Sequence, residues 1–172
     1  VKRVVSPDKD KLDTLVELIR HIGPQPGLIF CNFKDTIQFV SDHLTENDIS
    51  HGCFFGGMEQ KDRERALIKF RNGSHQLLIA TDLAARGIDI PELKFIIHYQ
   101  LPLKNEEFIH RNGRTARMHN EGTAYVVQWE GETVPSFIDA PIMDSLTRTK
   151  NADVQTWDTL FISGGRKDKI SK

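Results

Sequence analysis

A chain of 172 residues, with 38 % hydrophobic and 27 % charged residues, has the size of one ordinary domain, or of one domain with a piece of another. This apolar content is enough for a single packed core, which excludes wholesale disorder. No apolar run approaches the roughly 18 residues of a membrane-spanning helix. The first residues lack the apolar centre of a signal peptide.

Positive charge is unevenly distributed along the chain. The net charge of −1 by itself predicts no polyanionic partner, yet the last ten residues hold four positive charges and one negative charge. Three arginines also lie close together, at Arg111, Arg114 and Arg117. The missing initiator Met and the charged final residues lead us to expect a piece of a longer protein.

Apolar periodicity alternates between the helical and the strand type. In chain order it predicts a helix at 12–22, a strand at 28–31, a helix around 37–44, a strand at 51–55, a helix around 66–70, strands at 77–80 and 95–97, a short helix near 105–109 and a strand at 123–127. Strands that alternate with helices imply right-handed crossovers. The sequence therefore predicts an α/β fold, a parallel sheet with helices on both faces.

The pattern changes after Trp129. Residues 137–146 are predicted to form a helix that breaks near Pro141, residues 147–153 a polar linker and residues 157–162 a strand. We therefore expect one domain over residues 1–150 and a linker with the start of a second unit over residues 151–172.

Cys31 and Cys53 have no His or Cys at a metal-ligand spacing. We interpret them as buried free thiols of a protein in the reducing cytoplasm, and the sequence predicts no metal site.

Residues 110–117, HRNGRTAR, stand before the last predicted strand, where the loops of a parallel sheet gather functional groups. Arg114 and Arg117 are three residues apart and can reach one anion from one helical face or turn, and a guanidinium suits a phosphate. The alternative is a solvent-exposed basic helix. The chain has no G-x-x-x-x-G-K-[ST] phosphate cradle and no acid pair placed for Mg²⁺. Arginines without a cradle suggest an arginine finger that completes a site held elsewhere.

Two further residues suit a nucleic-acid backbone. Thr81 follows the strand at 77–80, and Arg63 stands at the start of a predicted helix. Each has a plain structural alternative, with Thr81 as a helix cap and Arg63 as a surface charge. Asp82 and Asp89 can likewise be a cap and a turn residue.

Four segments together carry a resemblance to a family. They are LIFCNF (28–33), GGMEQKDRERALIKFRNG (56–73), IATDLAARGIDIP (79–91) and IHRNGRTAR (109–117). In order and spacing they resemble the second RecA-like lobe of DEAD-box RNA helicases, over residues 1 to about 128. The resemblance implies a RecA-like fold of the P-loop NTPase class that lacks the P-loop.

The resemblance implies that Arg114 and Arg117 reach the γ-phosphate of ATP. ATP and Mg²⁺ would be held mainly by the N-terminal RecA-like lobe of the same protein, so this lobe alone is expected to be inactive. An arginine finger contributes about 10³–10⁵ in rate. The implied protein is an ATP-dependent RNA helicase.

The resemblance also assigns residues that couple the nucleotide to RNA. Gly87 and Asp89 would contact the ribose side of the nucleotide and the closed interface, and His110 and Arg111 would join the coupling interface. Contacts to RNA phosphates fall to Arg63, Thr81 and Arg86.

Three positions depart from the family's pattern. Phe33 stands where Thr or Ser is usual, Phe55 replaces a common His, and Asn112 replaces a usual apolar residue. The substitution at Phe33 removes a hydroxyl that would contact RNA.

Residues 159–172, TLFISGGRKDKISK, are similar to the opening of the RRM-like RNA-binding domain that follows the helicase core in DbpA-type bacterial proteins. This second resemblance implies structured ribosomal RNA as the partner and a role in ribosome assembly. A generic basic tail is the alternative.

Two other functions stay open at the level of the sequence. One is a non-catalytic RNA-binding or regulatory module with a helicase-like fold, against which the intact Asp89, His110, Arg114 and Arg117 argue. The other is a related helicase that acts on DNA.

Overall fold

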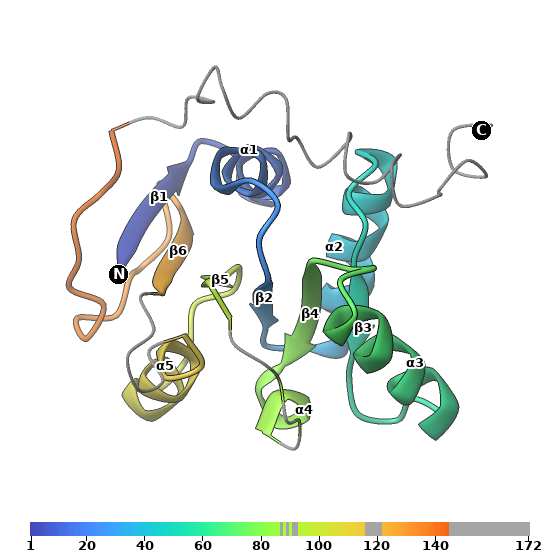
Figure 1. Ribbon diagram of the computed structural model, residues 1–172. Coiled ribbons are helices and arrows are strands. Elements are labelled where there is room, and N and C mark those ends of the chain that lie inside the picture. The colour runs from blue at the N-terminus through green and yellow to red at the C-terminus, as the bar shows by residue number, and fades with distance from the viewer. Residues whose placement is uncertain (87, 89, 91–92, 116–121, 145–172) are drawn as a thin grey trace.

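The computed structural model describes residues 1–86, 88, 90, 93–115 and 122–144. Its elements follow the order β1 (Lys2–Ser6), α1 (Leu12–Ile22), β2 (Gly27–Cys31), α2 (Lys34–Glu46), β3 (Gly52–Phe54), α3 (Gln60–Arg71), β4 (Leu77–Thr81), α4 (Asp82–Arg86), β5 (Phe95–His98), α5 (Asn105–Asn112) and β6 (Thr123–Trp129). All strand pairs are parallel, in the order β1-β6-β5-β2-β4-β3 (Figure 1). The predicted α/β fold is confirmed.

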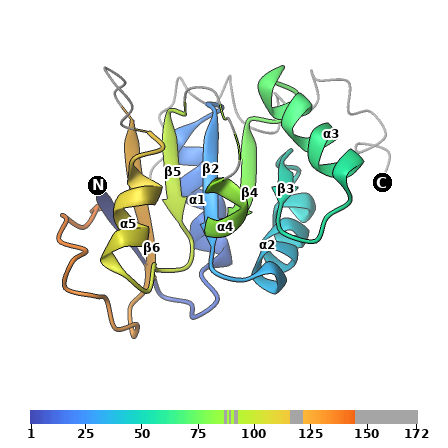
Figure 2. The ribbon, with the colours of Figure 1, turned by 90° about the horizontal axis from the view of Figure 1, so that it is seen from below.

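The helices cover both faces of the sheet. Seen from below, α4 and α5 lie in front of the strands, whereas α1 and α2 lie behind them (Figure 2). Side chains alternate along β2, so Ile29 and Cys31 pack in the core with α1 and α2, while Leu28 and Phe30 pack in the core with α3 and α4. A strand buried on both faces accounts for the continuous apolar run at 28–31.

The first strand was not predicted from the sequence. β1 has two charged residues among five and pairs in parallel with β6, from Lys2 opposite Tyr125 to Ser6 opposite Trp129. Its partner lies more than 120 residues away in the chain. Local periodicity in so short a segment could not reveal this pairing.

The helix predicted at 137–146 is wrong for the described residues 137–144. This segment begins in a turn at Phe137, and residues 141–143 then run along the free edge of β1, where the Arg3 amide donates to the Pro141 carbonyl (2.9 Å) and the Met143 amide donates to the Arg3 carbonyl (2.8 Å). Pro141 cannot continue a helix, and the extended chain covers an otherwise exposed strand edge. Residues 145–172, which include the predicted boundary near 150 and the strand at 157–162, lie outside the described residues.

Both cysteines are free thiols, with Cys31 buried and Cys53 half-buried. Burial raises the pKa of Cys31 to about 12 and also raises that of Cys53, so neither is a reactive thiolate at neutral pH. In the described part of the chain, no helix is long and apolar enough to cross a membrane.

Candidate functional site

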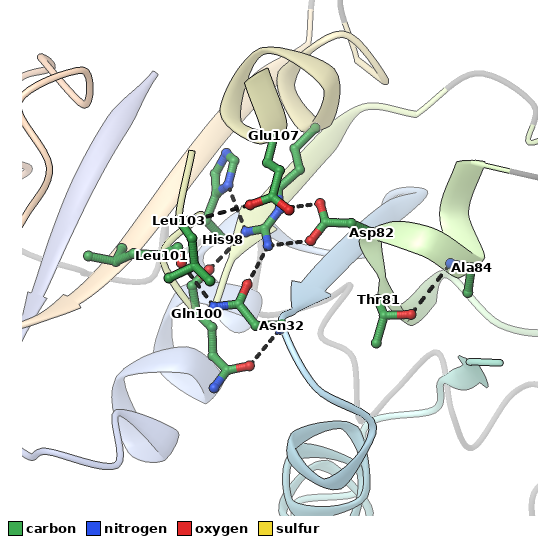
Figure 3. Close-up of polar contacts among 10 residues, drawn as sticks. Asn32, Thr81, Asp82, Ala84, His98, Gln100, Leu101, Leu103 and Glu107 are labelled. Carbon is green, nitrogen blue, oxygen red and sulfur yellow. Dashed lines mark hydrogen bonds and ion pairs between the residues drawn. The ribbon is translucent and has the colours of Figure 1, made fainter. Parts of the chain in front are cut away.

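The polar residues of interest gather at the carboxyl edge of the sheet. β2, β4 and β5 are neighbours, and the residues that follow their apolar cores are Asn32, Thr81-Asp82 and Gln100. Loops after parallel strands meet at one edge, so residues far apart in the sequence converge there. Figure 3 shows the side chains of Asn32, Asp82 and His98 directed towards one point, whereas the Gln100 side chain accepts a hydrogen bond from the backbone amide of Asn32.

Arg111 of α5 occupies that point and is only 1 % exposed. Its Nε and Nη2 donate to the two carboxylate oxygens of Asp82, both at 2.7 Å, and Nη2 also donates to Asn32 Oδ1 at 2.6 Å. Its Nη1 donates to the Gln100 carbonyl at 2.8 Å and lies 3.3 Å from His98 Nδ1. All five guanidinium N–H groups are therefore directed at acceptors within the lobe.

The charge of His98 follows from its contact with Arg111. An arginine only donates hydrogen bonds, so His98 Nδ1 accepts and the ring proton sits on Nε2, which donates to Asn112 Oδ1 at 2.8 Å. Burial and the guanidinium of Arg111 lower the pKa of His98 to about 3. His98 is therefore neutral at neutral pH, and it ties β5 to the end of α5.

Arg114 follows α5 directly and reaches across to α4. Its Nη2 donates to the carbonyls of Ala85 (2.7 Å) and Ile88 (3.1 Å). The side chain is half-buried and lines a cavity of about 360 Å³ at the carboxyl edge. Three arginines and one carboxylate are among the lining residues: Phe30, Asp82, Ala85, Arg86, His110, Arg111 and Arg114.

The electrostatics of this cavity favour an anion. Among its described lining residues the one carboxylate, on Asp82, is engaged in the bidentate pair with Arg111, whereas Arg86 and Arg114 add two positive charges. Arg86 and His110 are exposed. The described residues contain no group of three or more His, Cys, Asp or Glu side chains that could hold a metal ion. A phosphate is the ligand that this arrangement suits best.

The predicted site residues divide into two groups. The cavity brings together Arg86, His110, Arg111 and Arg114, and Arg111 lies at its buried floor rather than on an open interface. Gly87, Asp89 and Arg117 lie outside the described residues.

Thr81, the last residue of β4, and Arg63, in the first turn of α3, form the second group. Thr81 Oγ1 accepts a hydrogen bond from the Ala84 amide at 3.4 Å, which is the helix-cap role considered above. The Arg63 guanidinium lies 4.6 Å from the centre of the Phe54 ring, half-buried against it. Neither contact conflicts with a further contact to a backbone phosphate.

Sequence reasoning missed the residues that hold Arg111. Asn32, His98 and Gln100 are separated from Arg111 by 79, 13 and 11 positions. The available signal was a polar residue at the end of each apolar strand, and only Thr81-Asp82 were noted for that reason.

A six-stranded parallel sheet with an arginine-lined cavity at its carboxyl edge defines a RecA-like lobe. The profile of the helicase conserved C-terminal domain matches residues 10–119, and the chain belongs to this family. It is a C-terminal lobe of the DEAD-box type.

Known proteins support this assignment. The chain is 40 % identical over 120 residues to ATP-dependent RNA helicase eIF4A of Aspergillus clavatus, which covers 70 % of this chain and 30 % of that protein. It is similar to a chain in the crystal structure of Escherichia coli DEAD-box protein SrmB bound to RraA, with a TM-score of 0.74, 28 % identity and coverage of 87 % of this chain and 94 % of that chain. A DEAD-box protein from Methanococcus jannaschii gives a TM-score of 0.68 and 29 % identity over 76 % of this chain and 36 % of that chain. The chain thus spans about 30 % of the length of the curated relatives it matches.

Proposed function

We propose that this lobe works as the second half of an ATP-dependent RNA helicase and supplies arginine fingers to ATP bound on an N-terminal RecA-like lobe. The observation that carries the proposal is the cavity in which Arg114 lies beside an acid that is already paired. Arg114 and Arg117 contact the γ-phosphate, where charge develops as the terminal bond breaks. Mg²⁺ accompanies the ATP on the other lobe.

Phosphate contacts from Arg63, Thr81 and Arg86 bind RNA in this proposal. Thr81 ends β4, and Arg63 of α3 stacks on Phe54, which ends the neighbouring strand β3. Gly87, Asp89, His110 and Arg111 connect the two sites, with Arg111 acting through the loops that it holds rather than by touching either ligand. The relative eIF4A is named an ATP-dependent RNA helicase, which favours RNA over DNA.

We propose, more specifically, which kind of RNA the protein binds. The basic residues 159–172, similar to the start of an RRM-like domain of the DbpA type, suggest structured ribosomal RNA and a role in ribosome assembly. The unpaired thiols are in keeping with a cytoplasmic protein.

Steady-state ATP hydrolysis by the full-length protein tests this function. The rate is measured without RNA, with a generic single strand and with large-subunit ribosomal RNA, and this lobe alone is the inactive control. Preferential stimulation by ribosomal RNA supports the whole proposal, and equal stimulation by both RNAs supports a helicase without the ribosomal role. A rate that does not respond to RNA contradicts it and favours a non-catalytic binding module. Hydrolysis by the isolated lobe contradicts the assignment of ATP to the other lobe.

A further inference from the structure

Phe33 breaks two local rules at the carboxyl edge of the sheet. It is 60 % exposed although it is a large aromatic residue, and it occupies the N-cap position of α2, where its side chain makes no cap hydrogen bond. Ser, Thr, Asp or Asn at this position would stabilise the helix start. An aromatic ring here therefore lacks a stabilising role in the isolated lobe, and violations of this kind concentrate at functional sites.

Two cations that stand over aromatic rings lie at the same edge. Lys34 Nζ is 5.1 Å from the centre of the Phe55 ring, and the Arg63 guanidinium is 4.6 Å from that of Phe54. A ring holds a cation in place without neutralising its charge. Asp62, the acid next to Arg63, faces Arg65 at 3.9 Å.

The sheet register joins these residues into one strip. Cys31 at the end of β2 is opposite Thr81 at the end of β4, and Phe54 at the end of β3 is opposite Ala80. Lys34 from the β2 side reaches Phe55 on the β3 side, across the end of β4. The exposed Phe33 ring and the cations of Lys34 and Arg63 thus lie around the carboxyl ends of β2 and β3, on either side of β4.

Proteins bind single-stranded nucleic acid with this combination of groups, since cations contact the phosphates and exposed aromatic rings stack on the bases. We propose that Phe33 stacks on a base of single-stranded RNA that crosses the carboxyl ends of β3, β4 and β2. The inference rests on the proposed RNA-binding function and deepens it, because it adds a contact to a base where that function needs only phosphates. Such a contact is tolerant of sequence, since every base has a stacking face, but it requires that a base is present.

Binding of the full-length protein to a labelled oligouridylate, in the presence of a non-hydrolysable ATP analogue, tests the inference. The same oligonucleotide is also used with an abasic nucleotide placed at each position in turn. We expect Phe33→Ala to weaken binding to the intact strand about tenfold and Phe33→Tyr to bind as the wild type. When the abasic nucleotide is at the position that Phe33 contacts, the ring has no base on which to stack. The RNA affinities of the wild type and of Phe33→Ala should then differ by less than about twofold, as a double-mutant cycle requires.

Two further variants separate stacking from folding and from general apolar contact. Phe33→Ser restores a cap, so we expect its melting temperature to match or exceed that of the wild type while its RNA affinity falls. Phe39→Ala is the matched control, since Phe39 is 50 % exposed on α2 and lines a cavity that does not include Phe33. Its RNA affinity should not change.

Each contrary result has a distinct meaning. Intact RNA bound equally by wild type and Phe33→Ala overturns the inference, and the exposed ring would then belong to a contact with a protein segment. The inference is also overturned if an abasic nucleotide lowers the RNA affinity of the wild type equally at every position. It is likewise overturned if Phe39→Ala lowers the RNA affinity as much as Phe33→Ala does. A wild-type protein that binds no RNA contradicts the proposed function itself.

Discussion

Arg111 and Asp82 form a bidentate ion pair, with Nε–Oδ1 and Nη2–Oδ2 distances of 2.7 Å, between α5 and the first residue of α4. Arg111 is fully buried, so the pair is shielded from solvent on one side and open to the cavity on the other. It joins α4, which carries the proposed RNA contact Arg86, to the helix that precedes the proposed finger Arg114. The stability of the lobe and the geometry of the site therefore depend on the same contact.

Removing one partner of the Arg111–Asp82 pair should take away a large part of the free energy of unfolding. We expect Arg111→Ala to lower the free energy of unfolding by about 3–5 kcal/mol, because it leaves Asp82 without its partner and empties a buried volume. Urea denaturation of this chain measures the loss. The control is Arg65→Ala, which removes an exposed pair with Asp62 and should cost less than about 1 kcal/mol. Equal losses of unfolding free energy in the two variants would show that the buried pair contributes no more to stability than the exposed one.

The neutral state of His98 predicts a pH dependence of stability. Its pKa in the folded chain is about 3, below the ordinary value of 6.5, so the unfolded chain binds an extra proton between these two pH values. The contribution is fully present above pH 6.5 and is lost as the pH falls towards 3, by about 1 kcal/mol for each pH unit.

His98→Asn removes that titration, so its free energy of unfolding should fall less than that of the wild type between pH 6.5 and 5. Urea denaturation at these two values provides the comparison, and the other histidines cancel between the two proteins. Parallel pH profiles would be evidence that His98 titrates normally in the folded chain.

Gly27, the first residue of β2, is required by packing. A Cβ atom at this position would overlap the ring of Phe95, its partner on β5. We expect Gly27→Ala to destabilise the chain by about 1–3 kcal/mol and Phe95→Leu to restore part of that loss in the double variant. At Gly56 a Cβ would meet no atom within 4 Å, so Gly56→Ala serves as the control and should be nearly neutral in thermal denaturation.

The role proposed for Arg63 predicts a change in salt dependence. The slope of the logarithm of the RNA-binding constant against the logarithm of the salt concentration depends on how many phosphates the protein neutralises. It falls in magnitude by about 0.7 for each phosphate of a single strand that is no longer neutralised. Arg63→Ala in the full-length protein should show this change in an RNA-binding titration. Arg65→Ala is a matched control on the same helix, because residues two positions apart face different directions. An unchanged slope in Arg63→Ala would leave Arg63 as a surface charge stacked on Phe54.

Local signals in the sequence were sufficient for most of the fold. Buried strands such as β2 and β4 are continuous apolar runs, and α1 has a single apolar face, so both follow from periodicity alone. β1 and the segment at 137–144 depend instead on each other and on β6, across most of the chain. Their structure is set by the need to complete and cover an edge of the sheet, which no local window contains.

The candidate site was predictable in its residue types but not in its arrangement. The cluster at 110–117 stood out as a set of donors for an anion, and Arg114 does line the cavity. The sequence could not predict that Arg111 is buried, because its burial is decided by acceptors after β2, on α4 and in the loop after β5. Helical spacing placed the arginines near one another, whereas tertiary contacts gave them different roles.

Single-turnover ATP hydrolysis by the full-length protein, saturated with RNA, is the most direct test of the proposed action of Arg114 on ATP held by another lobe. Arg114→Ala should reduce the rate by about 10³–10⁵ with little change in ATP affinity, and Arg114→Lys should not restore it, because lysine lacks the planar fork of donors. Lys2→Ala, at the amino end of β1, should hydrolyse ATP at the wild-type rate. An Arg114→Ala protein that folds and keeps the wild-type rate would show that Arg114 is not an arginine finger.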